Sequence, residues 1–459
     1  MLPRLPNMPL KNNGRWIVDA DGRVVIIRGV NMINKLPPYT LSATGFGPDD
    51  ADLLAANGFN AVRVGVIYSA MEPSPGTWDN DYLWDIRGTV DMLASKGIMS
   101  LIDFHQDGWG PVFNGEGFPA WATVPPADEN KPNVPFPEVL KTPAVMAAFG
   151  NFWRNVNGPD GDPLQDHFAL AWSRAVQVLK DSPGILGWEL MNEPWPGDLL
   201  NEKDIIATHD DLRAFTNKVV AAIRAQDSDH MIWYEPWVTF DDGVPTFIGK
   251  IDDPAGRIGF AFHNYIDIAD PSRNYNQAWD NAIDHSDATG AALLATEFGA
   301  DTNPQVITDQ LATVNLKMLP AIYWAYWNRT PYVIAANGNI ISSEDMGLVY
   351  DLNQPRFAPG NLQTDRLAAL TQPYPMFIAG TPLNWSFDAD PAVRMFTLTY
   401  TPFTSGPNVT EIFVPELHYP NASYAVSTSG PVNVTKNGQL VTVETIGPVN
   451  EVTVYILPQ

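Results

Sequence analysis

The sequence predicts an α/β protein in which a (β/α)8 barrel is followed by an antiparallel β-sandwich. Eight short apolar runs alternate with segments of helical periodicity, as expected for parallel strands that are buried on both faces. From about residue 376 the pattern changes to alternating apolar and polar residues between Gly, Pro and Asn, which is typical of a sandwich. We therefore expect the barrel over residues 1–375 and the sandwich over residues 376–459.

The eight apolar runs are the expected barrel strands. They span residues 24–31, 60–68, 98–106, 185–194, 231–237, 258–265, 293–300 and 321–327. Helical patterns between them are clearest at residues 48–58, 81–97 and 209–226. Ahead of the first strand, residues 15–26 read as a hairpin with a turn at Asp21-Gly22, which we expect to close the bottom of the barrel.

Two long insertions interrupt the barrel pattern, at residues 107–166 and about 328–360. Loops of this length in a compact domain are usually functional. The first insertion is rich in Trp and Phe. Most of these aromatic residues are expected to pack internally, but their density also suggests a groove that accepts a lipid.

The composition excludes several classes of function. With 52 acidic and 27 basic residues the formal charge is -25, which argues against a nucleic-acid partner. The absence of cysteine excludes disulfides, thiolate metal sites and cysteine nucleophiles. No apolar run approaches the roughly 18 residues of a membrane span. The first ten residues contain no apolar signal core, and we expect a secreted protein whose signal peptide was removed or is absent from this sequence.

Polar and aromatic residues gather where the predicted strands end, which is where barrel enzymes place their active sites. They are Arg63, Asp103, His105, Asp107, Asn192, Glu193, Glu235, His263, Tyr265, Glu297, Trp324 and Trp327. Glu193 and Glu297 end the fourth and seventh strands. Two carboxyl groups that face each other across a barrel mouth suit glycoside hydrolysis, in which one protonates the leaving oxygen and the other attacks the anomeric carbon.

The neighbours of this pair have expected roles in catalysis or substrate binding. Arg63 and Tyr265 are placed to keep Glu297 ionised, because a positive charge and hydrogen bonds favour a carboxylate. Asn192 is placed to bond a sugar 2-hydroxyl, and Trp327 offers an apolar face to a sugar ring.

Structural interpretations remain open for several of these residues. His105 and His263 could be satisfied core histidines, and Arg63 a structural ion-pair partner. Glu235 also ends a strand before a proline, and composition alone does not separate it from the reacting pair. Glu189 shares strand parity with Glu193 and is expected to point into the barrel as a structural residue.

A metal site is a weaker interpretation of Asp103, His105 and Asp107. Their spacing without a further ligand cluster is a poor metal signature, and retaining glycosidases need no metal. We expect neither a metal nor an organic cofactor.

Four segments together resemble glycoside hydrolase family 5 of clan A, a family of retaining TIM-barrel enzymes. They are DGRVVIIRGVN (21–31), WELMNEPWPG (188–197), HNY (263–265) and LATEFGA (294–300). In that family the Glu of NEP is the acid/base and the Glu of TEFG is the nucleophile. The resemblance implies these roles for Glu193 and Glu297 and places Glu235 outside the pair.

Three further segments resemble the bacterial endoglycoceramidases of this family. They are NMINK (31–35), LIDFHQDGWG (101–110) and GEGFPAWAT (115–123). This resemblance implies that Lys35, Asp103, His105 and Asp107 contact the first sugar. His263 and Tyr265, at the end of the sixth predicted strand, are expected to bind substrate as well.

The implied activity is retaining hydrolysis of the β-glycosidic bond between oligosaccharide and ceramide in glycosphingolipids, by double displacement. Transient contact with a membrane or micelle surface is then expected. The alternatives are a galactosylceramide-specific endoglycosidase, a β-1,4-glucanase, and a carbohydrate- or lipid-binding barrel without activity.

Overall fold

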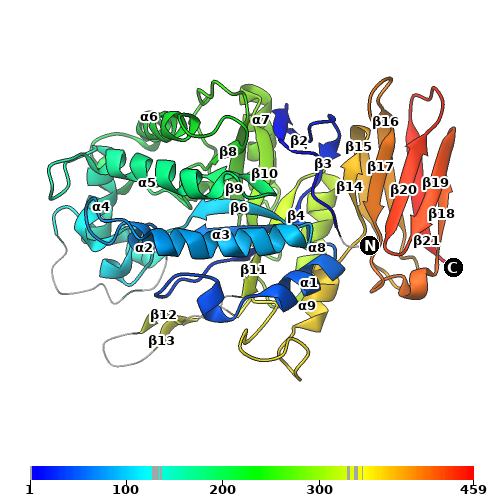
Figure 1. Ribbon diagram of the computed structural model, residues 1–459, viewed down its shortest axis with the longest axis horizontal. Coiled ribbons are helices and arrows are strands. Elements are labelled where there is room, and N and C mark those ends of the chain that lie inside the picture. Colours follow the sequence, from blue (N-terminus) through cyan, green and yellow to red (C-terminus); the bar gives the residue numbers. More distant parts are fainter. Residues whose placement is uncertain (1–2, 127–133, 135–136, 328–330, 335–339, 344) are drawn as a thin grey trace.

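The computed structural model describes residues 3–126, 134, 137–327, 331–334, 340–343 and 345–459. A closed barrel of eight parallel strands forms its larger part (Figure 1). The strands are β4 (Arg28–Met32), β5 (Ala61–Val66), β6 (Met99–Phe104), β7 (Ile185–Glu189), β8 (Met231–Tyr234), β9 (Ile258–Asn264), β10 (Ala292–Gly299) and β11 (Ala321–Trp327). Each overlaps one predicted run, and the barrel closes where β11 pairs with β4. The predicted fold class is confirmed.

Helices cover the outside of this barrel (Figure 1). They are α1 (Pro48–Ala56), α2 (Tyr68–Met71), α3 (Asn80–Ser95), α4 (Pro143–Trp153), α5 (Leu164–Leu179), α6 (Ile205–Arg224), α7 (Gln277–Thr289), α8 (Pro304–Leu316) and α9 (Thr364–Leu370). Helix α6 begins four residues before its predicted start. The reason is an N-cap, because the Asp204 side chain accepts a hydrogen bond from the backbone N–H of Ala207.

The N-terminal hairpin forms as predicted, but it belongs to a larger sheet. Its strands are β1 (Lys11–Asn13), β2 (Trp16–Val18) and β3 (Val24–Val25). The sheet order continues from β3 to β14 (Tyr374–Ile378), β17 (Val409–Phe413), β20 (Leu440–Thr445) and β19 (Val432–Asn437). The first predicted strand is therefore split, because Val24 and Val25 pair with Ile378 and Phe377, and only the following residues enter the barrel.

The C-terminal region adds a second antiparallel sheet, ordered β15 (Gly380–Phe387), β16 (Phe396–Pro402), β21 (Val452–Pro458) and β18 (Tyr424–Thr428). Buried side chains from both sheets share one apolar core with the lower ends of the barrel strands, including Leu101, Leu186 and Met231. The N-terminal hairpin lies at this junction, where the Leu293 N–H donates to the Arg15 carbonyl (Figure 1). The sandwich thus packs against the barrel end opposite to the predicted site.

The first insertion is largely structured, with 3-10 turns η2 (Pro111–Phe113), η3 (Ala120–Ala122) and η4 (Glu138–Lys141) before α4. Its aromatic residues Trp109, Phe113, Phe118, Phe149, Phe152 and Trp153 are each at most 4% exposed. Trp109 stacks on Phe118 with ring centroids 4.0 Å apart. These six side chains pack into the core, so they do not line a lipid groove, whereas Trp121 of the same insertion is half-buried. Phe136 of the same segment lies outside the described residues.

The second insertion carries a two-stranded hairpin, β12 (Pro331–Ile334) with β13 (Ile340–Ser343). The other short turns are η1 (Ser42–Thr44), η5 (Gly197–Asn201), η6 (Val238–Asp242) and η7 (Pro420–Ala422). Among the helices in the described residues, none is both long and apolar enough to cross a membrane.

Candidate active site

The centre of the site is the side chain of Arg63 on β5, which is completely buried. Its guanidinium contacts four carboxylates that neighbouring strands bring to the same layer. They are Glu297 at 2.5 Å, Glu189 at 2.6 Å, and Asp103 and Glu235 at 3.2 Å each. Burial alone would lower the pKa of Arg63, but these charges raise it well above its ordinary value.

Glu297 lies at the end of β10 and is 3% exposed. One of its oxygens contacts Arg63, and the other accepts a hydrogen bond of 2.5 Å from the Tyr265 hydroxyl. Burial raises the pKa of the Glu297 carboxyl, and the adjacent His263 and Arg63 oppose that shift. A carboxylate held by a cation and a hydroxyl is oriented for attack on an electrophile.

Glu193 follows β7 with a left-handed backbone, at φ 43°. One of its carboxyl oxygens lies 2.9 Å from Nδ1 of His263. Burial, followed by the negative charge of Asp107, raises the pKa of Glu193 to about 7. This carboxyl therefore holds a proton near neutral pH, as a general acid must.

Glu235 differs from the other two glutamates in its contacts. One of its oxygens contacts Arg63, and the other accepts a hydrogen bond of 2.9 Å from the backbone N–H of Glu193. Both oxygens are thus occupied in holding neighbouring groups. The sequence alone could not separate Glu235 from the pair, but the structure places it beneath Glu193, where it fixes the backbone.

A cavity of about 190 Å³ opens above these residues. It is lined by Lys35, His105, Asp107, Asn192, Glu193, Tyr265, Glu297, Ala300, Trp324 and Met346. Glu193 and Glu297 therefore face a common space that also carries cationic, amide and aromatic groups. Such a mixture is suited to a sugar, which offers hydroxyls at its edge and an apolar face.

Two predicted substrate contacts lie elsewhere. Trp327 is not among the residues that line the cavity, and the aromatic wall is formed by Trp324. The pairing of β11 with β4 is irregular between Tyr323 and Trp327, so the positions of these two tryptophans do not follow from the simple alternation of side chains along a strand. His263 is fully buried and lies below the cavity, where its ring nitrogens approach Glu193 and, at 3.7 Å, Glu297.

Polar residues that follow β4 and β6 complete one wall of the cavity. Nδ1 of His105 lies 2.8 Å from Asp103. Burial alone would lower the pKa of His105, but the negative charge of Asp103 outweighs this effect, and the pKa of His105 is raised to about 10. The ammonium of Lys35 contacts Asp107 and lies 4.6 Å from the ring centre of Trp324. The wall thus combines hydrogen-bond donors with an aromatic face.

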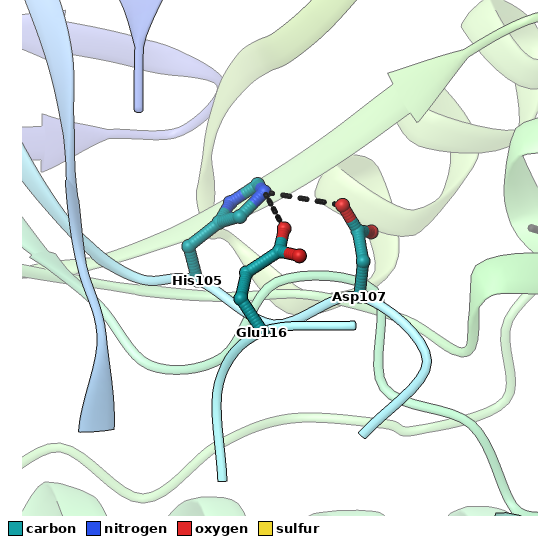
Figure 2. Close-up of side chains that lie close together, drawn as sticks. All are labelled: His105, Asp107 and Glu116. Carbon is teal, nitrogen blue, oxygen red and sulfur yellow. Dashed lines mark ion pairs between the residues drawn. The ribbon is translucent and has the colours of Figure 1, made fainter. Parts of the chain in front are cut away.

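Sequence reasoning missed two acidic residues of the site. Glu116 lies beside His105 and Asp107, and burial raises its pKa well above the ordinary value (Figure 2). Asp241 in η6 lies 3.7 Å from Nδ1 of His263, and burial together with Glu193 raises its pKa as well. The glycines on both sides of Glu116 were an available signal, whereas nothing in the sequence singles out Asp241.

The fold and the site together define a class of protein. A (β/α)8 barrel with buried carboxyls at the ends of β7 and β10 is the arrangement of a glycoside hydrolase. The model of the cellulase family (glycosyl hydrolase family 5) matches residues 18–332, and that of the glycoside hydrolase family 5 C-terminal domain matches residues 372–456. This chain belongs to glycoside hydrolase family 5.

Several relatives of this chain are named endoglycoceramidases. Endoglycoceramidase I of Rhodococcus hoagii is 30% identical over 93% of this chain and 84% of its own length. The structure of endo-glycoceramidase II from Rhodococcus sp. is 27% identical, covers 97% of this chain and 99% of its own, and superposes with a TM-score of 0.79. That enzyme has also been solved as a lactosyl-enzyme intermediate and with ganglioside GM3. An endogalactoceramidase structure, 22% identical with a TM-score of 0.76 and coverage of 99% and 100%, shares the fold.

Replacing Arg63 by Met should leave its four carboxylates buried without their cation. Burial already raises the pKa of Glu235 and Glu297, and Arg63 opposes that shift. Without Arg63 these two pKa values rise further, so the folded variant binds protons that the unfolded chain does not. Its stability relative to wild type should accordingly fall as pH rises from about 5 to 8, with a deficit of several kcal/mol at neutral pH.

The measurement is the urea midpoint of both proteins across that pH range. Arg213→Met is the matched control, because Arg213 pairs with Asp210 at the surface with 46% and 79% of the side chains exposed. A stability deficit of Arg63→Met that does not depend on pH would contradict the role of Arg63 as the shared counter-ion.

Proposed function

We propose that this protein is a retaining endo-glycosidase that releases the oligosaccharide of glycosphingolipids by hydrolysing its β-glycosidic bond to ceramide. The observation that carries the proposal is the shared cavity between Glu193 and Glu297, whose contacts prepare one carboxyl as an acid and the other as a carboxylate. Support for the substrate comes from relatives named endoglycoceramidase that align along nearly the whole chain.

The reaction follows from the two environments. Glu297 attacks the anomeric carbon while Glu193 gives its proton to the departing ceramide oxygen, and a glycosyl–enzyme ester forms. Glu193 is then ionised and removes a proton from water, which attacks the same carbon and releases Glu297. Tyr265 and Arg63 hold Glu297 in place through both steps.

The glycan is bound by the polar wall of the cavity. Lys35, His105 and Asp107 engage hydroxyls of the cleaved sugar, Asn192 is placed for its 2-hydroxyl, and Trp324 packs against its ring. Asp103 acts indirectly, since it is completely buried and bonds His105.

The ceramide leaves toward an apolar rim. Leu36 follows the cavity residue Lys35 and is 46% exposed, and Met346 lines the cavity with a partly exposed thioether. Burying an acyl chain contributes about 0.8 kcal/mol per CH2, so a few methylenes on such a rim suffice to orient the lipid. The rest of the chains can stay in a membrane or micelle, which the enzyme contacts transiently.

The two catalytic roles are separable by mutation. Glu297→Ser should reduce hydrolysis by about 10⁴-fold or more but still transfer glycan from a glycosyl fluoride of inverted configuration, because the acid/base remains. Glu193→Ala should impair substrates with poor leaving groups most, and azide should restore turnover of activated aryl glycosides. NMR of the azide product checks the assignment, since an azide of inverted configuration would mean that the roles are exchanged.

The pH profile should depend on the leaving group. For glycolipid, kcat/KM should fall as pH rises through about 7, where Glu193 loses the proton that it must donate. For a 2,4-dinitrophenyl glycoside, which leaves without protonation, this alkaline limb should flatten. Initial rates from pH 4 to 9 on both substrates test this, and equal alkaline limbs would contradict Glu193 as the acid.

The lipid specificity is tested by comparing three substrates. Ganglioside should be cleaved with a higher kcat/KM than a lyso-glycolipid or a soluble cello-oligosaccharide, and Leu36→Asp should narrow that difference. A better rate on cello-oligosaccharide would favour a β-1,4-glucanase, and a preference for galactosylceramide would favour the galactose-specific enzyme. If the protein hydrolyses none of these substrates and no aryl glycoside either, the proposal is overturned.

A further inference from the structure

Glu116 lies directly behind the cavity-lining residues Lys35, His105 and Asp107 and has no part in the double displacement. It belongs to the first insertion, and it is 2% exposed. The Asp107 N–H donates to the Glu116 carbonyl at 3.0 Å, and the Glu116 N–H donates to the Asp107 carbonyl at 3.2 Å. The insertion thus returns to its own first residue and brings a second carboxyl beside that of Asp107 (Figure 2).

Two glycines make this close approach possible. A Cβ on Gly115 would lie 1.8 Å from the Asp107 carbonyl oxygen, and one on Gly117 would lie 2.3 Å from Cβ of Gln106. Gly117 also has a φ of +123°, which side chains rarely adopt. The segment therefore packs closely against the backbone that follows β6. Within its Gly-Glu-Gly sequence, only Glu116 has a side chain beyond hydrogen.

The carboxyl of Glu116 faces two cationic groups of the sugar-binding wall. One of its oxygens lies 3.4 Å from Nζ of Lys35 and 3.9 Å from Nε2 of His105, and Asp107 lies 3.7 Å from the same His105 nitrogen (Figure 2). The ammonium of Lys35 is thus held between two carboxyls, above the face of Trp324.

Two polar atoms of this group lack a hydrogen-bond partner among the described residues. Nε2 of His105 and Oε1 of Glu116 are both buried, and their residues are each 2% exposed. Buried polar groups are normally paired. His105 lines the cavity, and Oε1 of Glu116 lies behind it, 3.4 Å from Nζ of the cavity residue Lys35. A polar group of a ligand in the cavity could therefore supply the partner that Nε2 of His105 lacks.

We propose that Glu116 is a positioning residue for the cleaved sugar, and that it holds Lys35 and His105 so that their N–H groups meet a hydroxyl of that sugar. The inference deepens the proposed function and rests on a glycoside occupying the cavity. The ligand-type atoms of His105, Asp107 and Glu116 also lie within 4.8 Å of one another, as a metal site would require. A sugar hydroxyl is favoured because two cationic groups, the Lys35 ammonium and the His105 imidazolium, already face the two carboxyls and offset their charge.

The test compares Glu116→Ala and Glu116→Gln with wild type, on an aryl β-glycoside and on analogues in which one hydroxyl of the cleaved sugar at a time is replaced by hydrogen. Glu138→Gln is the matched control, because Glu138 is an exposed glutamate of the same insertion. Glu116→Ala should lower kcat/KM on the parent substrate by about 10- to 100-fold, in line with the loss of contacts to charged groups. On the analogue without the engaged hydroxyl, wild type and variant should agree within about threefold.

Glu116→Gln keeps the shape of the side chain, so its loss on the parent substrate should be smaller than that of Glu116→Ala. An equal loss on every analogue would assign Glu116 a purely structural role and overturn the proposal. So would activity that is lost to a chelator and restored by a divalent cation, which would assign the group to a metal.

If Glu116→Ala does not fold, the test rests on Glu116→Gln, for which kcat/KM is compared between the parent substrate and each analogue. The same ratios as in wild type would overturn the proposal, and smaller ratios would support it. Because aryl glycosides are used, failure on ganglioside would count against the lipid assignment alone and leave the test of Glu116 intact.

Discussion

The catalytic end of the barrel depends on one buried guanidinium. Strands β6, β7, β8 and β10 each bring a carboxylate to the same layer, and four such charges could not be buried together without compensation. Arg63 on β5 has five N–H donors in a plane, so one side chain can contact all four. A lysine would offer a point charge in place of this fork. The position of Arg63 thus allows closure of the barrel with an acidic interior at its upper end.

The same arrangement separates the properties of the two catalytic carboxyls. Glu297 contacts the guanidinium directly, and the Tyr265 hydroxyl completes its hydrogen bonding. Glu193 instead contacts the imidazole of His263 and is exposed to the charge of Asp107, which helps to raise its pKa. Glu235 links the two halves, because it joins Arg63 to the backbone N–H of Glu193. One ion-pair network therefore positions both groups while it favours a different protonation state in each.

The barrel and its paired glutamates could be predicted because they follow local rules. Each strand is a continuous apolar run, and the carboxyls fall where those runs end. What could not be predicted depends on register and on distant partners. Trp324 lines the cavity and Trp327 does not, in a stretch where the pairing of β11 with β4 is irregular. Val24 and Val25 leave the first run because their partners, in β14, lie some 350 residues later. The role of Glu235 follows from two contacts that composition does not encode.

Chemistry and recognition are carried by different kinds of segment in this fold. The groups that contact Glu297 lie on strands or directly after them, and barrel closure fixes them within one rigid core. Lys35, Glu116 and Met346 lie outside the strands, on segments placed by backbone contacts such as the Asp107–Glu116 bridge. Loops on a rigid scaffold can change without disturbing the elements that they connect. Under the proposed function, these few loop residues are the ones that can alter the choice of glycan and aglycone, whereas the reacting groups are held by the barrel.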